Sequence, residues 1–307
     1  MHHIKALRPH QWIKNFFVFA ALIFSRNLTN LDLGLRSMLI FAAFSAVASS
    51  IYLVNDVADI ERDRQHPKKK FRPIASGKVN PKTALMMGAL LFPLGLGTAY
   101  WLSVPTGVVL TTYFIMNLGY STKLKHVVLL DVFIIALGFL LRVLAGAFAI
   151  GVGVSPWLLI CTLFGALFLA FCKRRNELTS LGENAGSHRA ILSEYSVGYI
   201  DNAISALTAM TVMSYALYTI DPAVCAKLGT DALVLTVPLV LFGAFRYLHL
   251  VHQKDKGGSP TMVMLTDISI QGVAFLLLAS AISFIYFNVQ LGLGGTMVRQ
   301  AGAVLIP

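Results

Sequence analysis

The stretch MLIFAAFSAVASSIYLV, residues 38–54, is followed without a break by NDVADIERD, residues 55–63. The first part is apolar enough to cross a membrane, and the second begins on its last turn. In a helix, which advances about 100° per residue, Asp56, Asp59 and Asp63 lie within about 60° of one another. Such carboxylates repel one another unless cations lie between them, and Mg²⁺ takes oxygen ligands while keeping waters and substrate phosphates. We therefore expect a metal–diphosphate site; the alternative is a solvated acidic helix end.

The composition is that of a protein embedded in lipid. Hydrophobic residues make up 56% of the 307 positions and charged residues 13%, against about 25% in soluble domains. No stretch remains for a soluble domain, so we expect one all-α transmembrane domain over residues 1–307. Nine apolar runs predict nine transmembrane helices in a bundle, although several are shorter than the roughly 20 residues of an ideal span. The runs cover residues 16–25, 36–54, 83–103, 105–118, 127–150, 155–172, 202–220, 231–250 and 269–290.

The distribution of basic residues predicts an orientation. Most of the 25 Lys and Arg residues fall at the N-terminus and in the loops after the even-numbered runs. Because basic loops stay on the cytoplasmic side, we expect the N-terminus and these loops in the cytoplasm, with the chain in a bacterial inner membrane. An odd number of spans then leaves the C-terminus outside. The net charge of +11 follows from this topology and is not a nucleic-acid footprint.

The loop after the acidic cluster supplies a candidate phosphate ligand, Arg72. It stands between Phe71 and Pro73, and prolines let the loop turn back towards the carboxylates. A planar guanidinium is suited to two-pronged contact with phosphate. The lysines at positions 68–70 are explained more simply as a cytoplasmic signal or as a contact for anionic lipid head groups.

Two further segments place polar side chains beside apolar runs. After the fourth run, Tyr120 and Lys123 are three residues apart and face the same way if the segment is helical, and Lys125 follows. At the start of the first run, Lys14 and Asn15 are placed to reach a cavity from the first helix. We expect all five side chains to bind substrate.

The acidic cluster and its loop resemble the first signature of the UbiA-type intramembrane prenyltransferase superfamily. The matching pattern is Asn55-Asp56-x-x-Asp59-x-x-x-Asp63, then His66-Pro67 and Arg72-Pro73-Ile74-x-Ser76-Gly77. The resemblance extends over nearly the whole chain through the nine expected spans. It implies a helical bundle around a central cavity that opens to the cytoplasm, with Mg²⁺ between the cluster and a diphosphate. The implied metal ligands are Asn55, Asp56, Asp59 and Asp63, and the three aspartates are the implied catalytic residues.

The chain departs from that family pattern after the sixth run. Where typical members carry a second Asp-x-x-x-Asp pair, this chain has Lys173, Arg174 and Arg175 and then a single acid, Glu177. Three cations in place of a metal-binding pair predict that this side of the pocket meets substrate phosphate directly, and Glu177 can still bind or orient a metal. The alternative is that the cations only anchor the helix end on the cytoplasmic side.

These departures, with the opening Arg8-Pro9-x-Gln11-Trp12-x-Lys14-Asn15, are similar to the decaprenyl-phosphate phosphoribosyltransferase branch of the superfamily. That resemblance implies Mg²⁺-dependent transfer of 5-phosphoribose from phosphoribosyl diphosphate to a polyprenyl phosphate, releasing diphosphate. No general base is required, since the lipid phosphate is already an anion. One alternative is a polyprenyl-diphosphate-dependent aromatic prenyltransferase of the 4-hydroxybenzoate type. Another is a non-enzymatic lipid-binding or transport protein, in which Arg142 inside a span lines a pathway.

Overall fold

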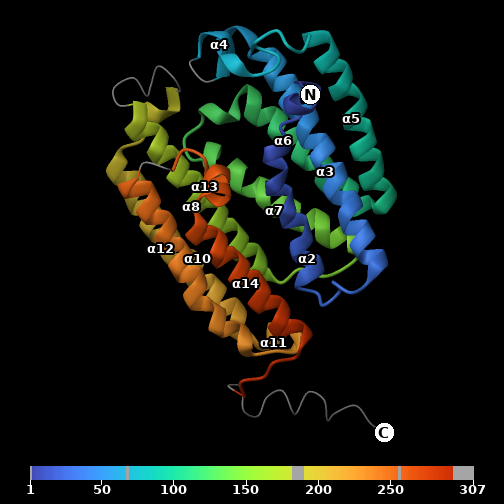
Figure 1. The fold of residues 1–307 in the computed structure, drawn as a ribbon, viewed down its shortest axis with the longest axis vertical. Coiled ribbons are helices and arrows are strands. Elements are labelled where there is room, and N and C mark those ends of the chain that lie inside the picture. Colours follow the sequence, from blue (N-terminus) through green and yellow to red (C-terminus); the bar gives the residue numbers. More distant parts are fainter. Residues whose placement is uncertain (1, 67–68, 182–189, 255–256, 293–307) are drawn as a thin grey trace. The chain divides into compact units, whose positions relative to one another are not determined.

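The computed structural model describes residues 2–66, 69–181, 190–254 and 257–292; Pro67 of the expected signature lies outside them. Every regular element in these residues is a helix, which confirms the predicted all-α fold class (Figure 1). The helices form two compact units. Unit 1 is Met1–Leu22 with Leu28–Val154, and unit 2 is Ile23–Asn27 with Ser155–Pro307. One domain over the whole chain stays a prediction.

The longest helix of unit 1 is α3, which has 28 residues. It starts where the Asn30 side chain accepts a hydrogen bond from the backbone N–H of Leu33, the usual way to satisfy a free donor at a helix start. In chain order the helices as far as residue 150 are α1 (His2–Ala6), the 3-10 helix η1 (Pro9–Phe19), α2 (Ala20–Ile23), α3 (Leu31–Ala58), α4 (Ile60–Gln65), the 3-10 helix η2 (Lys69–Phe71), α5 (Pro81–Leu102), α6 (Val104–Thr122), the 3-10 helix η3 (Leu124–His126) and α7 (Leu130–Ile150).

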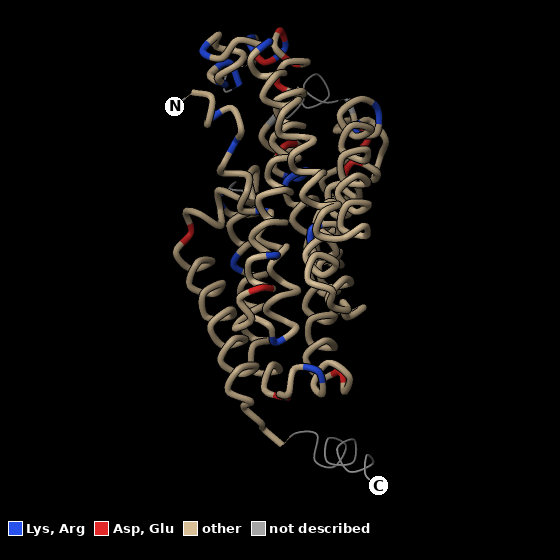
Figure 2. Tube along the Cα trace, turned by 90° about the vertical axis from the view of Figure 1, so that its right-hand side faces the viewer, with Lys and Arg blue, Asp and Glu red and all other residues tan. Residues whose placement is uncertain are grey.

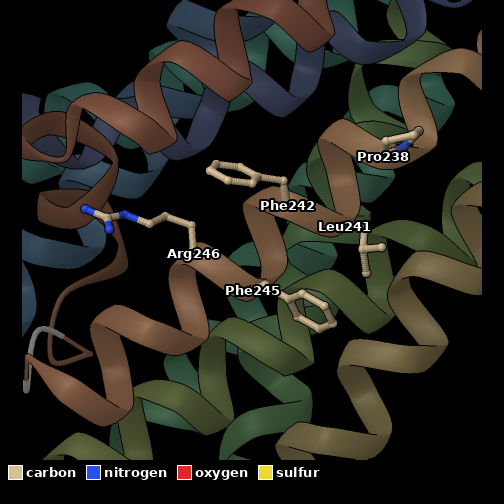
Figure 3. A pocket seen from close by; sticks show the side chains of 5 residues that line it. All are labelled: Pro238, Leu241, Phe242, Phe245 and Arg246. Carbon is tan, nitrogen blue, oxygen red and sulfur yellow. The ribbon is translucent and has the colours of Figure 1, made fainter.

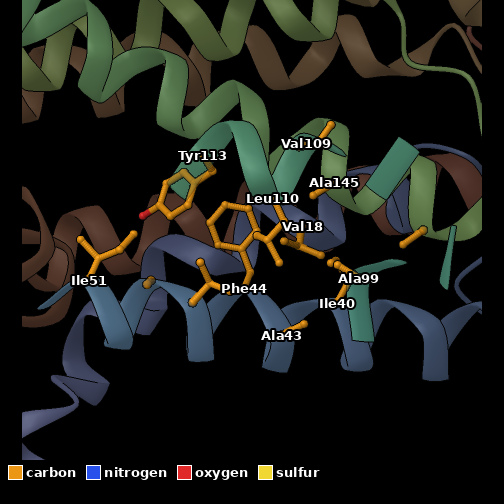
Figure 4. Close-up of a cluster of buried hydrophobic side chains, with 13 residues drawn as sticks. Val18, Ile40, Ala43, Phe44, Ile51, Ala99, Val109, Leu110, Tyr113 and Ala145 are labelled. Carbon is orange, nitrogen blue, oxygen red and sulfur yellow. The ribbon is translucent and has the colours of Figure 1, made fainter. Parts of the chain in front are cut away.

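The core of unit 1 lies where α3, α5, α6, α7 and η1 meet. The rings of Phe44 on α3 and Tyr113 on α6 are 4.5 Å apart at its centre (Figure 4). The α5 helix approaches α3 so closely that a Cβ atom at Gly95 would lie 2.7 Å from the carbonyl oxygen of Ala43. Small residues at helix crossings allow this close van der Waals packing, which replaces the hydrophobic effect inside a bilayer.

Unit 2 is a second group of helices with its own apolar core. The buried side chains of that core include Tyr218, Leu233 and Ile285. The helices are α8 (Pro156–Leu181), the 3-10 helix η5 (Ala190–Glu194), α10 (Val197–Ile220), α11 (Pro222–Leu228), the 3-10 helix η6 (Ala232–Thr236), α12 (Val237–Gln253), α13 (Pro260–Thr266) and α14 (Ile268–Tyr286).

Seven helices in the described residues are long and apolar enough to cross a membrane, by length and composition. All nine predicted runs fall on helical segments, but the runs at 16–25 and 105–118 are not among these seven. The first run is formed by η1 and the four-residue α2, which together extend about 28 Å at the rises of 3-10 and α-helices. The count of nine spans and the central cavity opening to the cytoplasm therefore stay predictions.

Candidate metal and substrate site

The acidic cluster lies at the end of unit 1 that carries α4, where charged segments gather (Figure 2). Asp56 is on the last turn of α3 and Asp63 is in α4, and the two residues are 3% and 1% exposed. Asp59 interrupts the helix between them, with φ −97° and ψ 10°. Its carboxylate is 40% exposed and lies 3.9 Å from the guanidinium of Arg62. The backbone still hydrogen-bonds in a helical pattern here, from Asp59 N–H to the Asn55 carbonyl and from Asp63 N–H to the Asp59 carbonyl. Among the described residues, however, the three carboxylates do not form a group that could hold a metal ion together.

Arg72 joins the two buried carboxylates. Its Nη1 atom donates to Oδ1 of Asp56 at 3.0 Å and to Oδ2 of Asp63 at 2.5 Å. The loop returns to the carboxylates as its prolines predict, and it is held by a backbone hydrogen bond from Val79 N–H to the Pro73 carbonyl. Two carboxylates bridged by one nitrogen atom lie close enough to share a single ligand.

A second arginine, Arg8, reaches the same carboxylate, and we did not predict its contact from the sequence. Its Nη2 atom is hydrogen-bonded to Oδ1 of Asp56, and its guanidinium lies 5.1 Å from the centre of the Tyr52 ring. The two residues of this ion pair are 48 positions apart. The available signal was an arginine in the polar opening of the chain, but nothing local indicated which acid it would meet.

The donor set can accommodate Mg²⁺ with help from substrate. In the part of the chain that the structure describes, no three His, Cys, Asp or Glu side chains lie close enough to hold a metal ion together. Mg²⁺ in phosphate-transfer sites is commonly bound through one or two carboxylates, with substrate phosphates and waters in the other positions. Asp56 and Asp63 meet that requirement, and the half-buried Asn55 precedes Asp56 on the same turn.

Asn15 has a different setting from the one its position predicts. It is 1% exposed, and its Nδ2 atom donates to Ser45 Oγ at 2.9 Å while its Oδ1 accepts from Arg142 Nε at 2.8 Å. Arg142 also donates to the Gly138 carbonyl and to the Tyr113 hydroxyl. Both the nitrogen and the oxygen of the Asn15 amide therefore have hydrogen-bond partners inside unit 1. Arg142 connects η1 to α6 and α7 through its hydrogen bonds.

The other expected ligands of unit 1 lie near the ends of helices. Lys14 is half-buried within η1. The α6 helix ends at Thr122, so Tyr120 is on its last turn and Lys123 is the exposed residue that follows. Lys125 is half-buried in the short helix η3. Their predicted contacts with substrate stay predictions.

In unit 2, the basic turn of α8 is already paired with acids. Arg174 is 1% exposed and contacts Glu177, and Lys173 Nζ lies 3.7 Å from the same carboxylate. Arg175 Nε donates to Oδ1 of Asp201 on α10 at 2.6 Å. The Asp201 partner was not predicted, although a carboxylate immediately before an apolar run was a visible signal.

His252 on α12 completes this group, because its Nε2 atom lies 3.3 Å from the same oxygen of Asp201. Its other ring nitrogen, Nδ1, is 3.0 Å from the Leu248 carbonyl. The ends of α8, α10 and α12 thus share one charged cluster.

A shallow apolar pocket lies elsewhere on α12 (Figure 3). It is lined by Pro238, Leu241, Phe242, Phe245 and Arg246. The arginine is held by Asp267, which accepts from Nη2 at 2.8 Å and also caps α14 by accepting from the Ile270 N–H. The hydrogen bond from Arg246 lowers the pKa of the Asp267 carboxyl below its ordinary value.

The apolar helices and the buried charged site at the end of α3 define the class as a multi-pass helical membrane protein with a polar site at the end of one candidate span. More specifically, the chain belongs to the UbiA prenyltransferase family, whose sequence profile matches residues 15–266.

Its relatives include the decaprenyl-phosphate phosphoribosyltransferase of Corynebacterium glutamicum, which is 36% identical over 284 residues, covering 88% of this chain and 82% of that protein. The protein of the same name from Mycolicibacterium smegmatis is 38% identical over 220 residues, 70% of this chain and 69% of that protein. Among solved structures, a UbiA homologue from Archaeoglobus fulgidus bound to GPP and Mg²⁺ has a TM-score of 0.67 at 18% identity, covering 93% of this chain and 100% of that one. This last likeness shows the fold.

Proposed function

We propose that the protein transfers 5-phosphoribose from phosphoribosyl diphosphate to a polyprenyl phosphate of the decaprenyl type, releasing diphosphate. The observation that carries the proposal is the pair of buried carboxylates, Asp56 and Asp63, joined by Arg72 at the end of a span. Relatives named decaprenyl-phosphate phosphoribosyltransferase, at 34% to 38% identity, supply the substrate class.

Asp56 and Asp63 hold Mg²⁺ in this proposal, with Asn55 and Asp59 as further ligands or as ligands of bound waters. When bound there, Mg²⁺ neutralises charge on the diphosphate leaving group. The carboxylates are fixed by their arginine partners, so they keep their positions without needing to reorganise. Arg72 is placed to donate to phosphate oxygens beside them, and guanidinium–phosphate hydrogen bonds are among the stronger ones in proteins.

The reaction exchanges one bond for another at C1 of the ribose. The bond from C1 to the diphosphate oxygen breaks, and its electron pair leaves with the diphosphate. An oxygen of the lipid phosphate forms the new bond to C1. The nucleophile is already an anion, so the chain needs to stabilise charge and does not need to remove a proton.

The remaining predicted ligands divide by their surroundings. Lys14, Tyr120, Lys123 and Lys125 in unit 1, and Lys173, Arg175 and Glu177 in unit 2, are proposed to bind substrate phosphate or ribose. Asn15 and Arg174 are almost fully buried and paired, so we propose that they act by holding neighbouring groups in place.

The proposed setting is a bacterial inner membrane, with the N-terminus and the polar loops in the cytoplasm and the C-terminus outside. The positive charge of the N-terminus and of the loops after α3 and α8 supports this orientation. Phosphoribosyl diphosphate is highly charged and does not cross a membrane, so a site on the cytoplasmic side suits it. We further propose that residues 1–307 work as one catalytic domain.

The test is to incubate purified protein with Mg²⁺, phosphoribosyl diphosphate and decaprenyl phosphate and to analyse the lipid by mass spectrometry. We expect the lipid to gain one phosphoribosyl group and one equivalent of diphosphate to be released. A parallel reaction with a polyprenyl diphosphate and 4-hydroxybenzoate examines the aromatic prenyltransferase alternative. Prenylated hydroxybenzoate, together with unchanged decaprenyl phosphate in the first reaction, contradicts the proposal.

A further inference from the structure

The segment before α2 lies along one face of α3. The polar residues of that face are Ser45, Ser49, Tyr52 and Asp56, whose spacing of four, three and four residues places them on one side of a helix. Ser45 binds Asn15, while Tyr52 and Asp56 both meet Arg8. A row of polar contacts therefore leads along α3 to the buried carboxylate.

Ser49 is the central contact in this row. It is 0% exposed, its Oγ accepts from the indole N–H of Trp12 at 3.1 Å, and its own hydroxyl donates to the Leu7 carbonyl at 3.0 Å. Leu7 immediately precedes Arg8, so this serine fixes the backbone from which the arginine side chain extends.

The backbone of Arg8 is held in a conformation that non-glycine residues rarely adopt. Its φ is 54° and its ψ is 57°, in the left-handed region, and Pro9 follows. Such a conformation costs free energy and persists only where the surroundings impose it, which is most common at functional sites. Here the contacts of Ser49 and the Asp56 carboxylate supply the restraint.

The guanidinium of Arg8 uses only part of its hydrogen-bonding capacity. It makes one hydrogen bond, to Asp56, and its other N–H groups have no hydrogen-bond partner among the described residues. The side chain is 22% exposed, so it is reachable from outside. The two positive charges of Arg8 and Arg72 balance the two negative charges of Asp56 and Asp63. With a divalent cation bound to the carboxylates, these four side chains and the cation would together carry a net positive charge. An anion with several oxygens is the complement of such a group.

This inference rests on the proposed function. We propose that Arg8 binds the diphosphate of the donor substrate and that Ser49 is the positioning residue that holds Arg8 in place for this contact. The N-terminal segment is then part of the substrate site, and its contact with α3 sets the affinity for diphosphate. Trp12 acts with Ser49 and has no contact with substrate.

The experiment measures binding of inorganic diphosphate with Mg²⁺ by calorimetry on the full-length protein, together with kcat and KM for both substrates. We expect Arg8→Gln to weaken diphosphate binding and to raise KM for phosphoribosyl diphosphate by about tenfold or more, the usual effect of losing a charged hydrogen bond. KM for the lipid phosphate should change little. The control is Arg36→Gln, which removes an exposed arginine paired with Asp32 at the other end of α3 and should bind diphosphate as the wild type does.

Ser49→Ala should weaken diphosphate binding in the same direction, and its effect should not add to that of Arg8→Gln in the double variant, because both act through one contact. The matched control is Ser50→Ala: this neighbouring serine is also buried, at 3% exposed, but its hydroxyl donates to the Val47 carbonyl within α3 itself. Additive effects, or equal effects of the two serine variants, contradict the positioning role.

Diphosphate binding by Arg8→Gln that equals that of Arg36→Gln overturns the proposal. If Arg8→Gln does not fold, Arg8→Lys decides, since it keeps the charge but loses the planar fork: weaker diphosphate binding supports the proposal and unchanged binding overturns it. Failure of the Arg8 proposal can be distinguished from failure of the proposed function. A wild-type protein that binds diphosphate through Arg8 but makes no phosphoribosyl lipid defeats only the proposed function.

Discussion

The acidic site of unit 1 and the basic turn of unit 2 both hold buried charges, which are negative in the first and positive in the second. In unit 1, Asp56 and Asp63 are buried and their counter-charges come from distant parts of the chain. In unit 2, Arg174 is buried beside an acid of its own turn, and Arg175 finds its acid on another helix. Buried charges need partners whatever their function. A run of like charges in the sequence therefore does not distinguish a substrate site from an anchor, and only variants can.

The largest expected effect is an all-or-none difference in cysteine labelling. It tests whether the acidic site and the segment after α12 are exposed on the same side of the membrane. Cysteines introduced at Glu61, near the acidic site, and at Lys254, after α12, should both react with an impermeant thiol reagent only in inverted vesicles. A cysteine at Asp32, at the other end of α3, should react only in intact cells. Glu61 and Asp32 are suited to labelling, with side chains 81% and 69% exposed.

The parent protein for this labelling should have its three cysteines, at positions 161, 172 and 225, replaced by alanine. Labelling at Glu61 and Lys254 from opposite sides would mean that the two regions cannot act on one substrate.

The next largest effect is expected at Asp63. Replacing it with Asn should lower kcat by about a hundredfold or more, as when one preorganised electrostatic contact is lost. Asp59→Asn is the matched comparison and should cost less, because its carboxylate is 40% exposed and does not share Arg72. Initial rates across a Mg²⁺ titration test both variants. Near-normal turnover of Asp63→Asn at limiting Mg²⁺ would contradict the metal assignment.

The basic turn gives a smaller effect. Arg175→Gln should raise KM for one phosphate substrate by about tenfold, since a charged hydrogen bond is worth about 1.5–3 kcal/mol. Arg36→Gln removes an exposed arginine with an i,i+4 partner, a pair worth well under 1 kcal/mol, and serves as the control. Unchanged Michaelis constants for both substrates would identify the turn as an anchor and reopen the aromatic prenyltransferase alternative.

The smallest effect concerns stability in unit 2. Arg246→Gln should lower the melting temperature by a few degrees at pH 7 with little loss of activity, because it removes the partner of a helix cap. Since Arg246 lowers the pKa of Asp267 in the folded state, its contribution is complete above the unfolded value of about 3.9 and is lost as the pH falls through the folded pKa. The difference between wild type and variant should therefore shrink at acid pH. A constant difference from pH 7 to pH 3 would exclude this cause.

Part of the fold could be predicted because its signals are local. Each of the nine apolar runs corresponds to helical structure, and the all-α class and the family are confirmed. The helix type of the first run was harder to predict, because the periods of about 3.0 and 3.6 residues per turn of 3-10 and α-helices are difficult to distinguish over 11 residues. The break at Asp59 was missed for a related reason: a regular period cannot reveal one residue with a non-helical ψ of 10°.

The sequence by itself determined the membrane class, the helical elements, the acidic cluster and the loop that returns to it, since run lengths and residue spacing fix these over short distances. Only the tertiary structure decided the charge partners: Arg8 for Asp56 and Asp201 for Arg175. The physical reason is that a buried charge is stabilised by whichever opposite charge the packing of helices brings within about 4 Å, and that choice depends on contacts between segments tens of residues apart.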